Sequence, residues 1–318
     1  MIMMPLILSM ALLLLKDERS ARTITMSVLA ISALLSFLLL TELLNTPSGY
    51  FTYVMGYYHA PYGNELRAGI LEALMSGAFT TVLFFSIMGG AADAKRDVRP
   101  EKIHYFYLMI NLLTSSLLAL IYTNDIFTGF VFMEIHMIAA CVILLAKESG
   151  ETLKATIKYM CMSILGSMLF LLGLAFLYGV TGHLLMESSR PVIEYWMATG
   201  MYRLPLVVTF TLFVVSTFIK SSLLPFHTWL PDAHGYATTA VSAILSGIVL
   251  KGYIIMMLKM IARVYGVDAA GMLGVMPVLF WLGLLSMTMG SLFALTQKDL
   301  KRMIAYSSVA HIGYIFMG

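Results

Sequence analysis

Ten charge-poor segments of helical length follow one another along the chain. They lie at residues 1–15, 24–44, 68–90, 103–122, 126–146, 155–180, 204–224, 236–262, 272–295 and 303–318. About 20 consecutive apolar residues cross the core of a bilayer. Because 60% of the residues are hydrophobic and only 12% are charged, one soluble core cannot hide the apolar surface. The sequence therefore predicts an all-α, polytopic membrane protein with about 10 transmembrane helices. No small-residue cleavage site precedes the charged Lys16, so the first segment is predicted to be a span rather than a signal peptide.

Lysine and arginine are distributed unevenly between the loops. Twelve follow odd-numbered segments, and four follow even-numbered ones. Cytoplasmic loops are enriched in these residues, so this asymmetry predicts that the N-terminus is outside and that the loops after odd-numbered spans are cytoplasmic. The aromatic loop at residues 45–67 then lies outside, at the membrane interface.

Three ionisable residues lie well inside predicted spans: Glu134 in the fifth, Lys220 in the seventh and Lys251 in the eighth. Each charge costs roughly 2.5–3.5 kcal/mol at the centre of a bilayer, so such residues usually mark an ion pathway. One alternative is a Glu134–Lys220 pair that only holds helices together. Another is lysines that extend along their stems to the interface. We expect the three residues to mark an ion pathway.

The seventh span contains a predicted break. Pro225 and Pro231 remove helical hydrogen-bond donors, so the helix must kink or stop there. Discontinuous helices are typical of ion sites in transporters. His227, Asp232 and His234 would lie near the cytoplasmic end of this break, as accessory pathway residues or as an ordinary polar loop.

Thr238, Ser242 and Ser246 form a polar stripe at four-residue spacing, which ends near Lys251. At about 100° per residue, Lys251 lies about 140° away from this stripe on a straight α-helix. Only a π-bulge would bring them together, and the sequence does not indicate one.

The sequence offers no cofactor or metal site. Cys141 and Cys161 are too few for an iron–sulfur cluster and form no CxxC motif. His136 would face away from Glu134 on a helix and is predicted to be a hydrogen-bonded core residue. A net charge of +3 gives no reason to expect a nucleic-acid partner.

Three segments resemble the antiporter-like subunits shared by respiratory complex I, Mrp-type sodium/proton antiporters and archaeal membrane-bound hydrogenase or sulfane sulfur reductase. They are residues 124–140, 225–253 and 296–315, and FVFMEI looks most like the Mrp and hydrogenase branch. The resemblance implies that Glu134 is the pairing glutamate, Lys220 the broken-helix lysine and Lys251 the central relay lysine. His311 falls at a commonly polar position, and Lys259 joins it as an accessory pathway residue.

The resemblance also implies an internal repeat. Residues 1–102 would be an N-terminal three-helix segment, and 103–265 would be a five-helix unit made of spans 4–8. Residues 266–318 would begin an inverted second unit, of which the chain contains two helices. A family member carries further helices, which another chain would supply or which a longer sequence would contain.

The implied function is ion translocation, of protons or sodium, in the cell membrane by a non-redox subunit of a complex I-like redox-driven pump. Its partners would be further antiporter-like and small membrane subunits, a peripheral redox module and the lipid bilayer. A stand-alone Mrp-type antiporter is one alternative, and a structural or assembly subunit with a degenerate half-channel is another. Whether the complex is an enzyme depends on that redox module.

Overall fold

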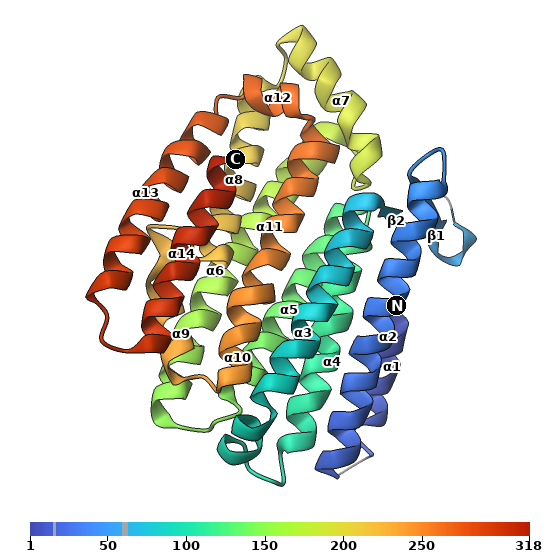
Figure 1. The fold of residues 1–318 in the computed structure, drawn as a ribbon. Coiled ribbons are helices and arrows are strands. Elements are labelled where there is room, and N and C mark those ends of the chain that lie inside the picture. The colour runs from blue at the N-terminus through green and yellow to red at the C-terminus, as the bar shows by residue number, and fades with distance from the viewer. Residues whose placement is uncertain (15–16, 59–62) are drawn as a thin grey trace.

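Short polar side chains define where several of the helices begin. Asp17, Asp125, Ser149 and Asp299 each accept a hydrogen bond from a backbone amide in the first turn of the helix that follows. The computed structural model describes residues 1–14, 17–58 and 63–318. Most of its long helices run almost parallel or antiparallel to one another in a bundle (Figure 1).

The helices are α1 (Met3–Ala11), α2 (Glu18–Asn45), α3 (Ile70–Asp97), α4 (Ile103–Tyr122), α5 (Ile126–Leu145), α6 (Gly150–Thr181), α7 (Met186–Thr199), α8 (Arg203–Ser221), α9 (Leu230–Tyr236), α10 (Thr239–Ile244), α11 (Leu250–Lys259), α12 (Val267–Met272), α13 (Met276–Thr296) and α14 (Leu300–Met317). Short 3₁₀ turns occupy Met55–Tyr57 and Phe226–Trp229, and π-helical segments occupy Leu245–Val249 and Met260–Tyr265.

Within the described residues, eight helical runs are long and apolar enough to cross a membrane. The chain is therefore an all-α polytopic membrane protein, as predicted. The prediction of a full span at residues 1–15 is wrong in extent, because α1 has nine residues and a length of only about 14 Å. The tenth predicted span corresponds to α14, which is not among these eight but lies directly beside α13 (Figure 1).

The predicted aromatic loop folds back on itself as a hairpin. Strand β1 (Tyr50–Val54) pairs antiparallel with β2 (Glu65–Gly69), with Tyr50 opposite Gly69. Residues 59–62 of this predicted loop lie outside the described residues.

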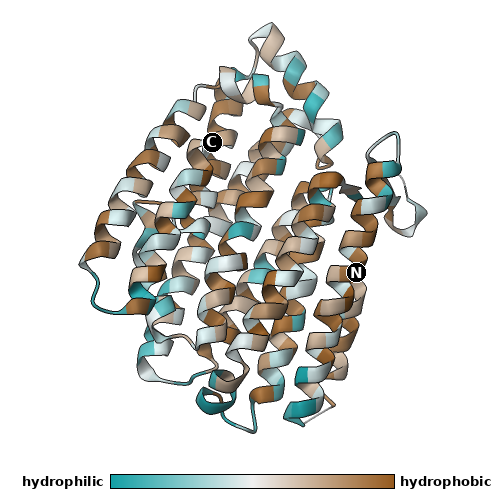
Figure 2. Ribbon diagram, in the orientation of Figure 1, coloured by the Kyte–Doolittle hydropathy of each residue, from teal (hydrophilic) through white to brown (hydrophobic). Residues whose placement is uncertain are grey.

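The two ends of the bundle are made of different connecting segments. The hairpin, α7 and α12 lie at the upper end in Figure 1, and the loops after α3, α5 and α13 lie at the lower end. In Figure 2 hydrophilic residues gather at the loops, whereas the helices are mostly hydrophobic. Ion pairs connect the lower loops: Glu148 contacts Arg99 (2.9 Å) and Lys102, and Lys147 contacts Asp97 (3.9 Å). The predicted cytoplasmic loops therefore share one end.

Burial distinguishes central from peripheral helices. In α4, 83% of the span is buried, against 22% in α13. The peripheral helices α13 and α14 still approach each other closely, through glycines. A Cβ added at Gly313 would lie 2.6 Å from the carbonyl oxygen of Gly283, and one added at Gly290 would lie 2.8 Å from the backbone nitrogen of Ala310. Small residues permit such backbone contact between membrane helices.

Candidate ion pathway

Glu134 and Lys220 form an ion pair between α5 and α8. Lys220 Nζ donates to Glu134 Oε1 over 3.2 Å. The hydroxyl of Ser167 in α6 donates to the same oxygen, so three helices meet at one carboxylate. The Lys220 side chain is 1% exposed and that of Glu134 is 25% exposed. The lysine is therefore sealed inside the bundle, whereas the carboxylate can be reached from its side.

Aromatic rings complete the surroundings of Lys220. Its Nζ lies 5.1 Å from the centre of the Tyr253 ring, close enough for a cation–π contact. The hydroxyl of Tyr253 lies 3.4 Å from that of Tyr159, whose ring packs on Trp229. At Gly166, a Cβ would come within 3.0 Å of Lys220 Cγ, so the glycine leaves room for the lysine stem.

The predicted helix break follows Lys220 directly. Helix α8 ends at Ser221, and Ser222 has a φ of 63°, in the left-handed region. In the last turn of α8, the carbonyl of Ile219 accepts a hydrogen bond from Trp229 Nε1 over 3.3 Å. The hydroxyls of Ser221 and Ser222 are buried and have no partner among the described residues. Irregular backbone of this kind is tolerated at membrane depth where it is buried in protein or lines a wet cavity.

Lys251 follows a π-helical segment and contacts the main chain of Ser246. Its Nζ donates to the carbonyl oxygen of Ser246, five residues earlier. The Leu245–Val249 segment is π-helical, and a π turn connects residues five apart. The helix before Lys251 is therefore not the straight α-helix that the expected angle of about 140° assumes. Among the described residues Lys251 has no carboxylate within ion-pair distance.

The three polar residues after the break have different surroundings. His227 is half-buried and stacks on Phe293, with ring centres 5.7 Å apart. Asp232 is paired with Lys158 (2.9 Å) and Arg302 (3.4 Å), so it ties α9 to α6 and α14. His234 is fully buried.

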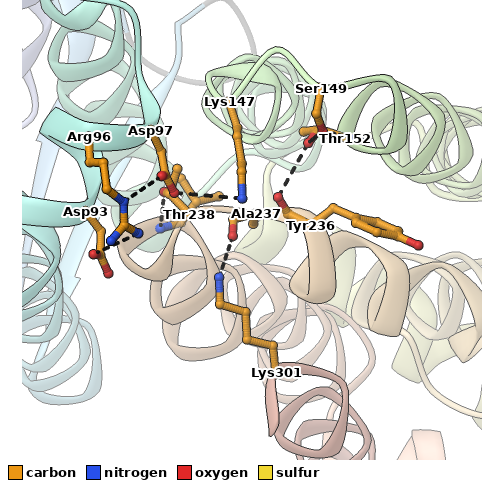
Figure 3. Close-up of polar contacts among 11 residues, drawn as sticks. Asp93, Arg96, Asp97, Lys147, Ser149, Thr152, Tyr236, Ala237, Thr238 and Lys301 are labelled. Carbon is orange, nitrogen blue, oxygen red and sulfur yellow. Dashed lines mark hydrogen bonds and ion pairs between the residues drawn. The ribbon is translucent and has the colours of Figure 1, made fainter. Parts of the chain in front are cut away.

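The turn between α9 and α10 is held by neighbouring helices through its carbonyl groups. The Tyr236 carbonyl accepts from Thr152 of α6 (3.4 Å), and the Ala237 carbonyl accepts from Lys301 of α14 (2.8 Å). Figure 3 shows these contacts beside the Asp97–Lys147 pair, where α3, α6, α10 and α14 converge.

Lys259 and His311 lie away from the Glu134–Lys220 pair. Lys259 is buried, and its Nζ donates to the carbonyls of Leu120 (3.4 Å), Ile121 (2.9 Å) and Thr123 at the end of α4. This arrangement suits a helix cap. His311 is exposed on α14 and lies near Tyr314, so the structure does not bring it to the other predicted residues.

Several polar residues of the interior had no signal in the sequence. Ser167 was missed because a serine in an apolar helix usually bonds to its own backbone. The buried pair of Glu72 and Arg263 was missed because 191 residues separate its members. His136 is a buried core residue as predicted, 3.3 Å from Ser116 Oγ and edge-on to Tyr253. The described residues contain no cluster of three or more His, Cys, Asp or Glu that could hold a metal.

The fold and the site together define a class: a polytopic helical membrane protein with a buried lysine–glutamate pair beside a broken helix. Residues 123–318 match the transmembrane family described as NADH:quinone oxidoreductase/Mrp antiporter. The chain belongs to this family, and the resemblance inferred from its motifs is confirmed.

Three relatives illustrate the similarity. NADH-quinone oxidoreductase subunit N of Desulforudis audaxviator is 32% identical over 84% of this chain and 52% of its own length. A Na⁺/H⁺ antiporter subunit of Alkalihalophilus pseudofirmus is 26% identical over 83% of this chain and 52% of its own. A chain of the archaeal membrane-bound sulfane sulfur reductase has a TM-score of 0.86 and 27% identity, over 99% of this chain and 63% of that one. The chain thus spans about half the length of the curated relatives it matches.

Proposed function

We propose that this chain is an ion-translocating subunit of a multi-subunit membrane complex, with Glu134, Lys220 and Lys251 as its proton relay. The observation that carries the proposal is the sealed Lys220, which contacts one carboxylate and stands directly before a helix break. Lysine suits the role because a buried ammonium can lose its proton, whereas arginine stays charged.

The relay works by making and breaking the Glu134–Lys220 pair. While the pair is closed, the carboxylate stabilises the protonated lysine. When a neighbouring subunit pulls Glu134 away, Lys220 gives up its proton towards Lys251 and is refilled from the side of His227. Breaking a buried pair costs about 3–5 kcal/mol. That exceeds the roughly 2.3 kcal/mol needed to move one charge against 100 mV, so opening one pair can drive one proton.

We further propose that the chain lies in the cell membrane with its N-terminus outside and the Lys/Arg-rich end of the bundle in the cytoplasm. Its partners would be other antiporter-like subunits, small membrane subunits and a peripheral redox module. This is supported by the relatives, which include a subunit of a quinone oxidoreductase and a chain of a respiratory membrane complex. The chain itself would bind no cofactor, and residues 103–265 would form its antiporter-like unit.

A gradient-driven Mrp-type antiporter is the second candidate, and the similarity to a subunit of a Na⁺/H⁺ antiporter supports it. Native mass spectrometry of the complex purified from its membrane distinguishes the two. Copurification with a metal-cofactor redox module supports the redox-driven pump, whereas copurification with small membrane subunits alone supports the antiporter.

The relay is tested by substitution in the intact complex reconstituted in vesicles. Lys220→Ala or Lys251→Ala should abolish coupled proton translocation and leave the driving reaction partly active. Exchanging the charges, with Glu134→Lys and Lys220→Glu together, should restore a structural pair but not a relay. Full translocation in either alanine variant would overturn the proposal.

A further inference from the structure

A groove lies between α4 and α5 at the Lys/Arg-rich end of the bundle. The two helices pack side by side, and the groove lies where α4 begins at Ile103 and α5 ends at Leu145 (Figure 1). Its volume is about 350 Å³. The residues that line it are separate from Glu134, Lys220 and Lys251, so the proposed relay gives this groove no role.

Apolar side chains form the floor and the walls of the groove. Phe106 of α4 lies at the floor and is only 3% exposed. Tyr105 of α4 and Val142 of α5 stand at the two edges, where they are 46% and 37% exposed. Met109 and Leu145 are partly buried and complete the walls. This lining suits a hydrocarbon chain rather than a polar solute, because it offers almost no hydrogen-bonding groups.

The mouth of the groove is charged. Lys102 and Glu148 line it and contact each other, and Arg99 reaches the same carboxylate through Nε over 2.9 Å. The side chains of Lys102 and Arg99 are 52% and 66% exposed, so both also face solvent. One carboxylate offsets only one of the two cationic charges. The mouth therefore has an excess positive charge beside an apolar groove.

The other charged residues of these two loops are either paired or turned away from the groove. Lys147 pairs with Asp97 over 3.9 Å, and Arg96 pairs with Asp97 over 3.2 Å (Figure 3). Glu101 is exposed and is not among the residues that line the groove. The excess charge at the mouth thus belongs to Lys102 and Arg99.

A groove of this composition matches a phospholipid. Seven residues separate Lys102 from Met109, so α4 rises by about 10 Å from the charged mouth to the inner end of the groove. An acyl chain extends from a phosphate in the same direction, from the membrane surface into the hydrocarbon core. Tyrosines such as Tyr105 are common at headgroup level. Arginine can bind a phosphate through two parallel hydrogen bonds, and basic pockets between membrane helices bind anionic headgroups.

We propose that this groove is a binding site for one phospholipid with a net negative headgroup. Its phosphate contacts Lys102 and Arg99, and one acyl chain lies between Tyr105 and Val142. The excess positive charge favours an anionic lipid over a zwitterionic one, because a net charge of −1 neutralises the mouth. The site goes beyond the proposed function and does not depend on the relay.

The test uses the intact complex in lipid nanodiscs and two photoactivatable probes. One is a phosphatidylglycerol and the other a phosphatidylcholine, and both carry the same diazirine in one acyl chain. After illumination, mass spectrometry locates the labelled residues. The phosphatidylglycerol probe should label residues 98–109 and 142–148 roughly tenfold more than the phosphatidylcholine probe does.

Charge substitutions at the mouth should change this preference in opposite directions. Arg99→Gln together with Lys102→Gln should abolish it, because the phosphate loses both cations. Glu148→Gln removes the competing carboxylate and should preserve or increase it. Lys95→Gln together with Arg96→Gln takes the same charge from the end of α3, outside the groove, and serves as the matched control that keeps the preference.

A bulky substitution tests the apolar part of the site. Val142→Trp fills the groove and should reduce labelling by both probes. Equal labelling by the two probes in the unmodified complex would overturn the proposal, because the headgroup would then not be recognised. Absence of labelling by either probe would also overturn it and would show that a neighbouring subunit covers the groove. Equal preference in the Arg99/Lys102 double variant and its matched control would exclude these two residues as the phosphate ligands.

Discussion

The members of the central ion pair differ in how deeply they are buried. Lys220 is 1% exposed, and Glu134 is 25% exposed and also bonds to Ser167. If Glu134 is lost, a charged lysine remains where water cannot reach it. If Lys220 is lost, the carboxylate keeps one hydrogen bond and some access from the side of the bundle. The pair is therefore asymmetric, with the glutamate as the member that is exposed at the side of the bundle.

This asymmetry predicts unequal losses of stability. Glu134→Ala should lower the free energy of unfolding by about 3–5 kcal/mol, because it leaves an unpaired buried charge. Lys220→Met should cost less, about 1–3 kcal/mol, because only hydrogen bonds to the carboxylate are lost. Thermal unfolding of the purified complex in detergent measures both. The double variant should recover most of the Glu134→Ala loss, and equal losses in the single variants would contradict the asymmetry.

Lys259 makes the second prediction at this scale. Lys259→Met should free the carbonyls at the end of α4 and increase amide hydrogen exchange around residues 119–126, at a cost of about 1–3 kcal/mol. Lys259→Arg retains donors and should preserve much of the protection. Mass spectrometry measures the hydrogen exchange of the backbone amides in both variants. Unchanged exchange around residues 119–126 in Lys259→Met would argue against a capping role.

Individual helices are shaped by local departures from regular geometry and by small residues at their contacts. Helix α8 breaks directly after Lys220, and a π-helical segment precedes α11, where Lys251 contacts the Ser246 carbonyl. The contact between α3 and α10 depends on a glycine instead. Gly89 and Gly90 are adjacent in α3, yet only at Gly90 would a Cβ collide with α10, where it would lie 2.8 Å from the backbone nitrogen of Ala240.

The two glycines provide a matched comparison. Gly90→Ala should destabilise the chain by about 1–3 kcal/mol, because the methyl group meets the α10 backbone. Gly89→Ala meets nothing within 4 Å and should be neutral or stabilise by up to about 1 kcal/mol. Thermal unfolding of the two variants side by side measures the difference, and equal effects would show that α3 and α10 do not pack this closely.

The bundle as a whole is connected at its Lys/Arg-rich end by ion pairs between loops. Glu148 accepts from Lys102 and pairs with Arg99, and so joins the α3–α4 loop to the α5–α6 loop. The hydrogen bond from Lys102 holds the pKa of Glu148 below its usual value, and the nearby Arg99 charge acts in the same direction. A depressed pKa stabilises the folded state above the unfolded pKa of about 4.3, and this stabilisation is lost as pH falls through the folded value.

Glu148→Gln should therefore remove a stabilising contribution that exists only near and above a pH of about 4.3. The melting temperatures of wild type and variant should differ at about pH 6 and converge by about pH 3. Because the pair is exposed, high salt should also reduce the difference. A difference that persists in acid would show that Glu148 contributes by packing rather than by charge.

Much of this protein follows from its sequence. Apolar segments of spanning length require helices, because only an α-helix satisfies its own backbone inside lipid. Charges inside a membrane are costly enough that their positions in the spans alone identify Glu134, Lys220 and Lys251 as interior residues. The prolines also predict the break after Lys220, since they remove hydrogen-bond donors wherever they stand. Each of these features depends on the local sequence or on the surrounding lipid, and not on contacts between distant segments.

Only the tertiary structure decided which polar groups meet. That Ser167 shares the Glu134 carboxylate, that Glu72 reaches Arg263, and that Lys259 caps α4 all depend on contacts between distant segments. The π-helical turn before Lys251 was equally hidden, because one extra residue in a turn leaves the apolar composition unchanged. Hydropathy determines that each segment lies in the membrane, but the rotation of a helix about its axis is set by the neighbours against which it packs.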